Sequence, residues 1–345
     1  MATTTTKIKK TKRQTQQYKN KTRRRVRGGN GKFRALQCHP KIKKQRASSN
    51  INANTNTNNT CMSSQLLHDI KNKYNSDKAP ENKIHAGAED TTVLYKELQT
   101  HITECKDKDE SCWLNELDDI KQKHHYEKTL YAPRQPKEWA KNKNEWLSNI
   151  DIDKVMTQYE ETYPDFHFIG PTTIDFATTV GDACVSPELC HFQLSHYMTH
   201  APNATSHTTH PPHPIKTKIG IVFNLDKHDQ SGSHWVSLWL DTEARTVMYF
   251  DSAHNPVPPE IRAFLDKIHK QASELNVEIT EHVNKIQHQY SSSECGMYSL
   301  YFIITMLENS HNSKTRNAKI KMFEYERIPD KKVEKFRNVF FNPSL

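Results

Sequence analysis

The sequence predicts an α+β fold, a mixed central sheet flanked by helices, with a small helical region on its N-terminal side. Three short apolar runs joined by polar connections, Ile219–Leu225, His234–Leu240 and Thr246–Phe250, are typical of neighbouring strands. Pro258–Leu275 carries its apolar residues at helical spacing, and two prolines open it. A second apolar segment with helical spacing begins directly behind Cys295. Alternating strands and helices of this kind form a layered domain.

The net charge of +9 is unevenly placed along the 345 residues. Residues 1–50 hold 17 Lys and Arg and no Asp or Glu, so 49 − 17 = 32 basic residues face 40 acidic ones in the rest of the chain. A slightly acidic body therefore carries a strongly basic tail. The body is not a basic nucleic-acid-binding domain. The tail is a contact for DNA or another polyanion, a nuclear-import signal or a solubilising arm, and its composition leaves these open.

Composition divides the chain into three parts. Residues 1–63 are rich in Thr, Asn and basic side chains and offer little to bury, which predicts a disordered tail. Residues 64–135 form a predicted helical region and a linker that Pro133 and Pro136 punctuate. Residues 136–345 form the main domain. Three helices of the helical region are predicted from apolar positions at helical spacing: Leu66, Leu67 and Ile70; Val93, Leu94, Leu98 and Ile102; Trp113, Leu114, Leu117 and Ile120.

Within the main domain, a predicted helix follows Trp146-Leu147-Ser148-Asn149, and Phe166–Ile169 is a short strand. Residues 201–214, rich in Pro, His and Thr, are predicted to form a loop. The run His234–Leu240 has apolar residues on both faces, which predicts a central strand. A further strand over Val277–Val283 leads to the helix behind Cys295.

Secretion and membrane insertion are not expected. The basic start is followed by no apolar segment of the signal-peptide kind, and no run approaches the roughly 18 apolar residues that a membrane span needs. Seven cysteines are an odd number at irregular spacing, which argues against a disulfide framework. These features predict an intracellular, reducing compartment with free thiols.

Four side chains have the residue types of an activated cysteine nucleophile. Cys295 stands at a helix start, where the helix dipole favours a thiolate. His234 begins one strand and Asp251 ends the next, so the two are expected to meet at one sheet edge, with the carboxylate orienting the imidazole. Gln289 supplies an amide that, with a backbone N–H near Cys295, can bind an oxyanion.

Each of these residues also has a simpler interpretation. A lone cysteine before an apolar helix is usually a small core residue. Asp226 and Asp229 compete with Asp251 as the orienting carboxylate, although a position in a solvated loop is expected for both. His254 is a possible second imidazole and is interpreted as a loop residue.

A metal site competes with the cysteine nucleophile. Cys184, Cys190, His196 and His200 are candidate zinc ligands, and the two histidines would share a helix face. The spacing between the pairs differs from that of common zinc fingers. We therefore predict neither a metal nor a cofactor, and the alternative is a helix with polar-face histidines and two buried thiols.

The order and spacing of Trp146-Leu147, His234-Trp235, Asp251-Ser252, Gln289 and Glu294-Cys295-Gly296 resemble the SUMO-specific and adenain-type cysteine proteases. The resemblance covers roughly residues 140–308, and papain-type enzymes have the reverse order, cysteine before histidine. Within the family, the pattern is most similar to the polyprotein-processing proteases of large nucleocytoplasmic DNA viruses.

This resemblance implies an adenain/SUMO-protease-like fold and a role for each residue. His234, Asp251 and Cys295 would be the catalytic triad and Gln289 the oxyanion donor. Trp235 and Trp146 would bind substrate by roofing a tunnel that admits only glycine. The implied function is a cysteine endopeptidase, a thiol protease that cleaves structural core polyproteins after Gly-Gly-X during particle maturation, in the virion and the host cytoplasm.

Two alternatives follow: an isopeptidase that removes SUMO- or ubiquitin-like modifiers, and a basic nucleic-acid-binding core protein. Asn149 stands where SUMO proteases usually carry an Asp that contacts SUMO, which weakens the isopeptidase interpretation. The tail itself contains Gly28-Gly29-Asn30, so self-cleavage after Asn30 is a further hypothesis.

Overall fold

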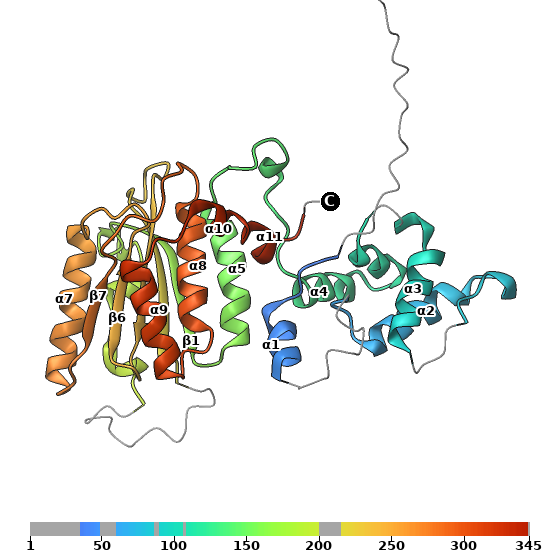
Figure 1. Ribbon diagram of the computed structural model, residues 1–345, viewed down its shortest axis with the longest axis horizontal. Helices are drawn as coiled ribbons and strands as arrows, with labels where there is room; N and C mark the ends of the chain where they lie inside the picture. Colours follow the sequence, from blue (N-terminus) through green and yellow to red (C-terminus); the bar gives the residue numbers. More distant parts are fainter. Residues whose placement is uncertain (1–34, 49–59, 86–89, 106–107, 200–214, 344–345) are drawn as a thin grey trace, which may run out of the picture.

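The computed structural model describes residues 35–48, 60–85, 90–105, 108–199 and 215–343. A sheet unit and a helical unit lie side by side, and the last helices of the chain lie at the junction between them (Figure 1). The basic segment up to residue 34, with its Gly-Gly-Asn sequence, and the predicted loop 201–214 lie outside the described residues.

The sheet has five strands in the order β1-β4-β5-β6-β7. The outer pairs, β1 with β4 and β6 with β7, are parallel, while β4, β5 and β6 are antiparallel. The sheet is therefore mixed, and the predicted α+β class is confirmed. The strands are β1 (Phe166–Thr173), β4 (Lys218–Asn224), β5 (Trp235–Asp241), β6 (Thr246–Phe250) and β7 (Thr280–Val283).

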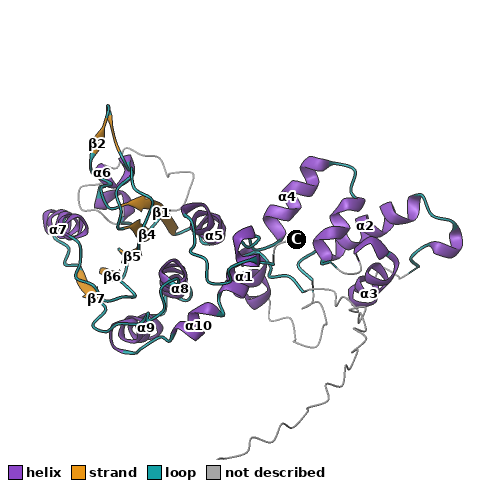
Figure 2. Cartoon of the chain, turned by 90° about the horizontal axis from the view of Figure 1, so that it is seen from above, coloured by secondary structure: helices purple, strands orange, loops and turns teal. Residues whose placement is uncertain are grey.

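Helices cover both faces of this sheet (Figure 2). On one face lies α7 (Pro259–Glu274), and on the other lie α5 (Asn149–Thr162), α8 (Cys295–Leu307) and α9 (Ser313–Tyr325). Strand β5 is central and every one of its residues is buried, as predicted. Its Trp235 and Trp239 pack in the core under α8, whereas Val236 and Leu238 pack in the core under α7.

Several elements have no counterpart in the predictions. After β1, a two-stranded hairpin projects from the sheet unit, followed by a one-turn helix (Figure 2). The chain ends in two further short helices. These elements are β2 (Thr179–Val180), β3 (Ala183–Cys184), α6 (Pro187–Cys190), α10 (Asp330–Glu334) and α11 (Arg337–Phe340). Each is shorter than the window over which apolar periodicity can be recognised.

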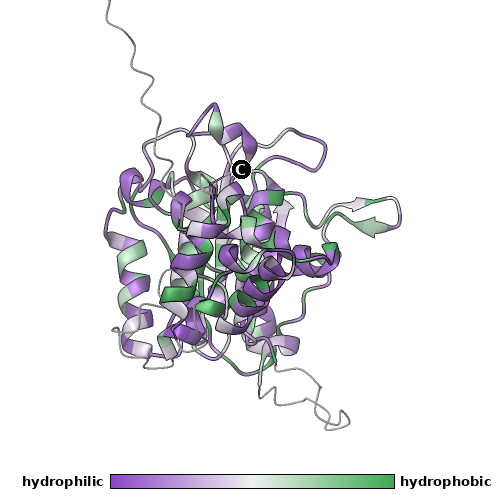
Figure 3. Ribbon diagram, turned by 90° about the vertical axis from the view of Figure 1, so that its right-hand side faces the viewer, coloured by the Kyte–Doolittle hydropathy of each residue, from purple (hydrophilic) through white to green (hydrophobic). Residues whose placement is uncertain are grey.

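The helical unit contains α2 (Ser64–Ser76), α3 (Thr91–His101) and α4 (Ile120–Leu130) around a core of its own that includes Trp113. Helices in Figure 3 carry both hydrophilic and hydrophobic residues, as expected where one face of a helix packs on a core. The single helix predicted around Trp113 is wrong. A 3₁₀ helix, Glu110–Glu116, precedes α4, because Asp109 and Asp119 each accept a backbone N–H and so start separate helices.

The predicted disorder of residues 1–63 is wrong for residues 35–48, which include α1 (Pro40–Ser48). This segment has little apolar periodicity and is held by distant parts of the chain. Cys38 is bonded to Cys61, the backbone N–H of His39 donates to the Leu130 carbonyl at 2.8 Å, and α1 packs on α5. These tertiary contacts offset the low apolar content on which the prediction rested.

The prediction of free thiols is wrong for six of the seven cysteines. Disulfides join Cys38 to Cys61, Cys105 to Cys112 and Cys184 to Cys190, with Cα–Cα distances of 5.2, 5.7 and 6.3 Å. Cys295 is the free cysteine. Pairing depends on proximity in space, which irregular spacing does not reveal, so the argument for a reducing compartment loses this support. No helix among the described residues is long and apolar enough to cross a membrane.

Candidate active site

His234 and Asp251 meet at one edge of the sheet. His234 directly precedes β5 and Asp251 directly follows β6, and the antiparallel register, in which Ser237 lies opposite Phe250, brings the two together. The distance from His234 Nε2 to Asp251 Oδ1 is 2.6 Å. The competing carboxylate of Asp226 instead accepts the backbone N–H of Gly232 at 3.0 Å.

The carboxylate of Asp251 is fully buried and closely held. Besides His234, it accepts the backbone N–H groups of Ala253 and Asn255 and the Asn255 side-chain amide, at 2.8 to 2.9 Å. Asn284 fixes its backbone by exchanging two hydrogen bonds with it, at 3.0 and 2.8 Å. Burial alone would raise the pKa of Asp251, but the bond to His234 and the backbone donors outweigh burial and lower it. Asp251 is therefore an ionised acceptor at neutral pH.

The imidazole of His234 lies between Asp251 and the thiol of Cys295. Burial opposes its protonation, but hydrogen bonds to both partners and their charges outweigh burial and raise the pKa of His234 to about 10. Nε2 is bonded to Asp251, so Nδ1 is the nitrogen left for the sulfur. At neutral pH this geometry favours a protonated ring beside the cysteine.

Cys295 is the first residue of α8, which packs across β5. The first hydrogen bond of the helix runs from the Tyr298 N–H to the Glu294 carbonyl, at 2.8 Å. The N–H groups of the first turn, including that of Cys295, therefore have no acceptor within the helix. They and the helix dipole stabilise negative charge on the sulfur or on an oxygen bound beside it.

Gln289 lies at the same sheet edge and its amide is oriented. Its Oε1 accepts the hydroxyl of Ser252 at 2.7 Å, and its Nε2 donates to the Ser291 carbonyl at 2.7 Å. The Ser252 carbonyl accepts the Gln289 backbone N–H at 2.9 Å, so the residue after Asp251 holds Gln289 from two sides. One hydrogen of Nε2 remains for a further acceptor.

The two tryptophans line one open groove of about 430 Å³. Trp146 is exposed on its rim, whereas Trp235 is buried and donates from Nε1 to the Leu147 carbonyl at 3.0 Å. Gly296, directly after Cys295, closes against both walls: a Cβ there would lie 3.0 Å from Leu147 Cβ and 3.2 Å from Trp235 Cδ1. Asn149 also lines the groove.

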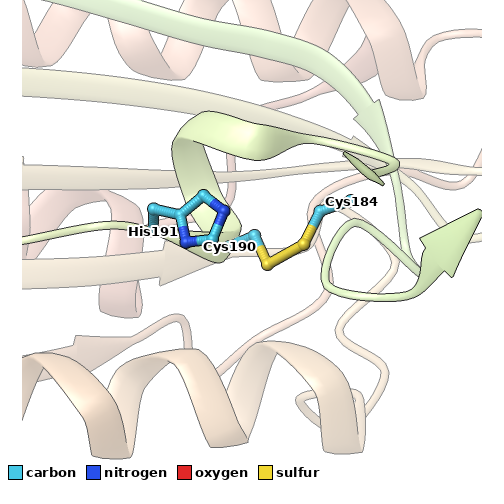
Figure 4. A group of neighbouring side chains, drawn as sticks. All are labelled: Cys184, Cys190 and His191. Atoms are coloured by element: carbon cyan, nitrogen blue, oxygen red, sulfur yellow. A yellow bond between two sulfur atoms is a disulfide. The ribbon is translucent and has the colours of Figure 1, made fainter. Parts of the chain in front are cut away.

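The four residues considered as zinc ligands do not come together as one site among the described residues. The sulfurs of Cys184 and Cys190 are bonded to each other, and His191 lies beside them (Figure 4). His196 stands in a 3₁₀ turn, Leu194–Tyr197, and is not part of this cluster, while His200 lies outside the described residues. A zinc ion is bound by thiolates, which a disulfide does not supply.

Three contributing residues, Asn255, Asn284 and Arg337, were missed in the sequence, and Glu294 was recognised only as part of the motif around Cys295. Asn255 and Asn284 hold Asp251 in place, and Glu294 next to Cys295 pairs with the distant Arg337. Asn255 stands only four residues after Asp251 and could have been recognised as a local partner. Asn284 and Arg337 are separated from their partners by 33 and 43 residues, so no local signal identifies them.

The chain is similar in sequence and in fold to known proteins. The model of the Ulp1 protease family, C-terminal catalytic domain, matches residues 152–342, just over half of the chain. R355 of Acanthamoeba polyphaga mimivirus, which carries a thiol-protease name, is 31% identical over 164 residues, covering 47% of this chain and 48% of its own. The SUMO-1 cysteine protease S273R of African swine fever virus is 31% identical over 126 residues, covering 36% and 43%.

The chain thus matches about half the length of these curated relatives. A crystal structure of the African swine fever virus pS273R protease superposes with a TM-score of 0.55 at 18% identity, over 90% of this chain and 97% of the other. This likeness shows a shared fold that includes the helical unit. On the match of the catalytic-domain model, the chain belongs to the Ulp1 protease family.

Proposed function

We propose that this protein is a cysteine endopeptidase whose nucleophile is Cys295. The observation that carries the proposal is the meeting of His234, Asp251 and the free thiol of Cys295 at one edge of the sheet, beside a groove lined by two tryptophans. We assign one role to each group: the Asp251 carboxylate orients the His234 imidazole, the imidazole carries the proton, and the Cys295 sulfur attacks the substrate carbonyl.

The reaction proceeds in two halves. The Cys295 thiolate adds to the carbonyl carbon of the scissile bond, and the resulting oxyanion accepts the Gln289 amide and the Cys295 backbone N–H. His234 then donates its proton to the leaving amine, the C–N bond breaks, and a thioester remains. Water, deprotonated by His234, hydrolyses the thioester and releases the carboxylate product and the thiol. Asp251 stays ionised throughout.

The substrate is a polypeptide with glycines just before the cut, cleaved after Gly-Gly-X. The proposal is supported by Trp146 and Trp235, which both line the groove, since bulky rings on a substrate groove favour a residue without a Cβ between them. We further propose a structural polyprotein processed during virus particle maturation, in the virion and host cytoplasm. The viral setting is supported by the relatives in Acanthamoeba polyphaga mimivirus and African swine fever virus.

An isopeptidase is the second candidate, because the family model and the SUMO-1 protease names of relatives favour it. Ubiquitin-like modifiers also end in Gly-Gly, so specificity for glycines before the cut suits both substrates. The neutral Asn149 at the groove, where SUMO proteases usually carry an Asp, favours the endopeptidase.

A contact between the basic tail and DNA stays a prediction. Salt-dependent retention of the full chain on DNA, compared with that of a chain lacking residues 1–34, measures this contact.

The decisive experiment compares purified protein and its Cys295→Ala variant on Gly-Gly-X peptides and on SUMO and ubiquitin conjugates. We expect cleavage of the peptides by the wild type and none by Cys295→Ala. The double variant Cys184→Ser/Cys190→Ser is the matched control, because it removes two sulfurs outside the groove and is expected to keep its activity. Retained activity in Cys295→Ala, or its loss in the control alone, contradicts the assignment. Cleavage of conjugates but not of peptides favours the isopeptidase.

A further inference from the structure

Arg337, on the short C-terminal helix α11, is buried and reaches the residue that precedes Cys295. Its Nε and Nη2 donate to the two carboxylate oxygens of Glu294 at 3.0 and 2.8 Å. Its Nη1 donates to the Glu145 carbonyl at 3.0 Å, and its guanidinium lies 4.2 Å from the ring centroid of Trp139. One side chain thus holds three segments that are far apart in the sequence.

The charge of Glu294 makes this contact chemically significant. Its side chain is 1% exposed and lies next to the nucleophile in the chain. An unpaired carboxylate there would disfavour a thiolate on Cys295 and would itself be costly to bury. The planar fork of Arg337 matches both carboxylate oxygens, so it neutralises this charge and also fixes the direction of the loop.

The same contact links the segment that carries Trp146 and Leu147 to the segment that carries Cys295. Glu145 directly precedes Trp146-Leu147, and Glu294 directly precedes Cys295-Gly296. On the groove side, Gly296 closes against Leu147. Independently of that contact, Arg337 joins Glu145 to Glu294. The wall and the nucleophile are therefore held together at two places.

We infer that Arg337 is a positioning residue that aligns Cys295 with the groove and compensates the charge of Glu294. The inference rests on the proposed function, in which Cys295 is the nucleophile. Arg337 touches neither substrate nor thiol and acts through Glu294 and the Glu145 carbonyl. If the ion pair only stabilised the fold, its loss would lower thermal stability and leave the chemistry of the remaining folded protein unchanged.

The test measures the alkylation of Cys295 by iodoacetamide against pH, using intact mass under non-reducing conditions. The other six cysteines are paired, so the added mass reports on Cys295. Peptide cleavage and thermal unfolding are measured on the same samples. The variants are Arg337→Met and Arg337→Met/Glu294→Gln. Arg262→Met is the matched control, because Arg262 on α7 makes a similar pair of hydrogen bonds to both carboxylate oxygens of Glu281 on β7, and neither residue lines the groove.

For Arg337→Met we expect alkylation at pH 7 to slow by about tenfold or more, its pH midpoint to rise, and kcat to fall by a similar factor, since about one unit of midpoint is a tenfold change. Adding Glu294→Gln removes the stranded charge, so the midpoint returns toward the wild-type value. Arg262→Met leaves midpoint and kcat unchanged. A midpoint and kcat that stay at wild-type values in Arg337→Met, with only thermal stability lowered, overturn the inference.

Two milder variants decide the matter if Arg337→Met does not fold. Glu294→Gln alone leaves the guanidinium uncompensated and is expected to lower the alkylation midpoint. Arg337→Lys keeps the positive charge but loses the guanidinium that binds both oxygens of Glu294. The pH midpoint of Cys295 alkylation is therefore expected to stay at the wild-type value, while kcat falls because the loop is no longer fixed in direction. A midpoint that does not move in Glu294→Gln contradicts the inference. If the wild type cleaves no substrate, the proposed protease function fails, while the alkylation measurements still judge the positioning role.

Discussion

At the scale of single residues, the site depends on side chains that orient other side chains. Gln289 illustrates this, because its amide would serve as an oxyanion donor only in the orientation that Ser252 selects. The Ser252 hydroxyl donates to Gln289 Oε1 at 2.7 Å and so points Nε2 the opposite way. The two residues differ in role: one is expected to touch the oxyanion and the other to position the donor.

Replacing Gln289 by Ala is expected to lower kcat by about 10²- to 10³-fold with little change in KM, because an oxyanion donor acts on the transition state. Ser252→Ala should lower kcat less, since the amide remains and loses only its orientation. Steady-state kinetics on one Gly-Gly-X peptide measures both. A Gln289→Ala enzyme with near-normal kcat contradicts the role.

The charge state of His234 predicts a pH dependence of stability. The folded-state pKa, raised to about 10, lies above the unfolded value near 6.5, so this contribution is fully present below about pH 6.5 and is lost as pH rises toward 10. The difference in unfolding free energy between wild type and His234→Gln should therefore shrink over this window, no more steeply than about 1.4 kcal/mol per pH unit. Urea unfolding at pH 6, 8 and 10 measures it, and a difference that grows with pH contradicts the assigned charge state.

At the scale of elements, the start of α8 is where stability and activity are expected to separate. Gly296 lies in the first turn of α8, where Ala would favour the helix by up to about 1 kcal/mol. The added Cβ, however, would lie 3.0 Å from Leu147 Cβ and 3.2 Å from Trp235 Cδ1, which forces the groove walls apart. The steric effect should dominate activity because both walls are packed.

Gly296→Ala is accordingly expected to lower kcat/KM on Gly-Gly-X peptides by about tenfold or more, since small displacements at a reacting centre are costly. Thermal stability should change little. Thr305→Ala, on the same helix but away from the groove, is the control and should keep its activity. Full activity in Gly296→Ala would contradict this prediction, because it would show that Leu147 and Trp235 can move aside without a cost to catalysis.

At the scale of the whole molecule, the segment after α11, residues 341–343, contacts the connection between the helical unit and the sheet unit. Asn342 is 1% exposed, and its side chain makes three hydrogen bonds of 2.6 to 2.9 Å with Gln37 and Ala132. Its backbone pairs with Pro133 and Gln135, each at 2.7 Å. The segment predicted as a linker is therefore held by the end of the chain.

Asn342→Ala would remove the side-chain partner of the Gln37 backbone N–H and of the Ala132 carbonyl, which should cost about 1–3 kcal/mol of unfolding free energy per stranded group. Urea unfolding and limited proteolysis of the intact chain measure the effect. Asn338→Ala is the matched control, because Asn338 is exposed and makes one long contact of 3.4 Å with Gln135. Equal stability of the two variants would contradict the stabilising role of Asn342 in the contact between the two units.

The sequence by itself determined the five strands of the main sheet, the amphipathic helix α7 and the central position of β5, because these depend on the local alternation of apolar and polar residues. It also predicted that His234 and Asp251 meet, since a short connection leaves antiparallel strands little freedom. Only the tertiary structure decided the rest. The three disulfides, the ordering of residues 35–48, and the contacts of Arg337 and Asn342 join residues distant along the chain, and each arises from proximity that the packed core creates.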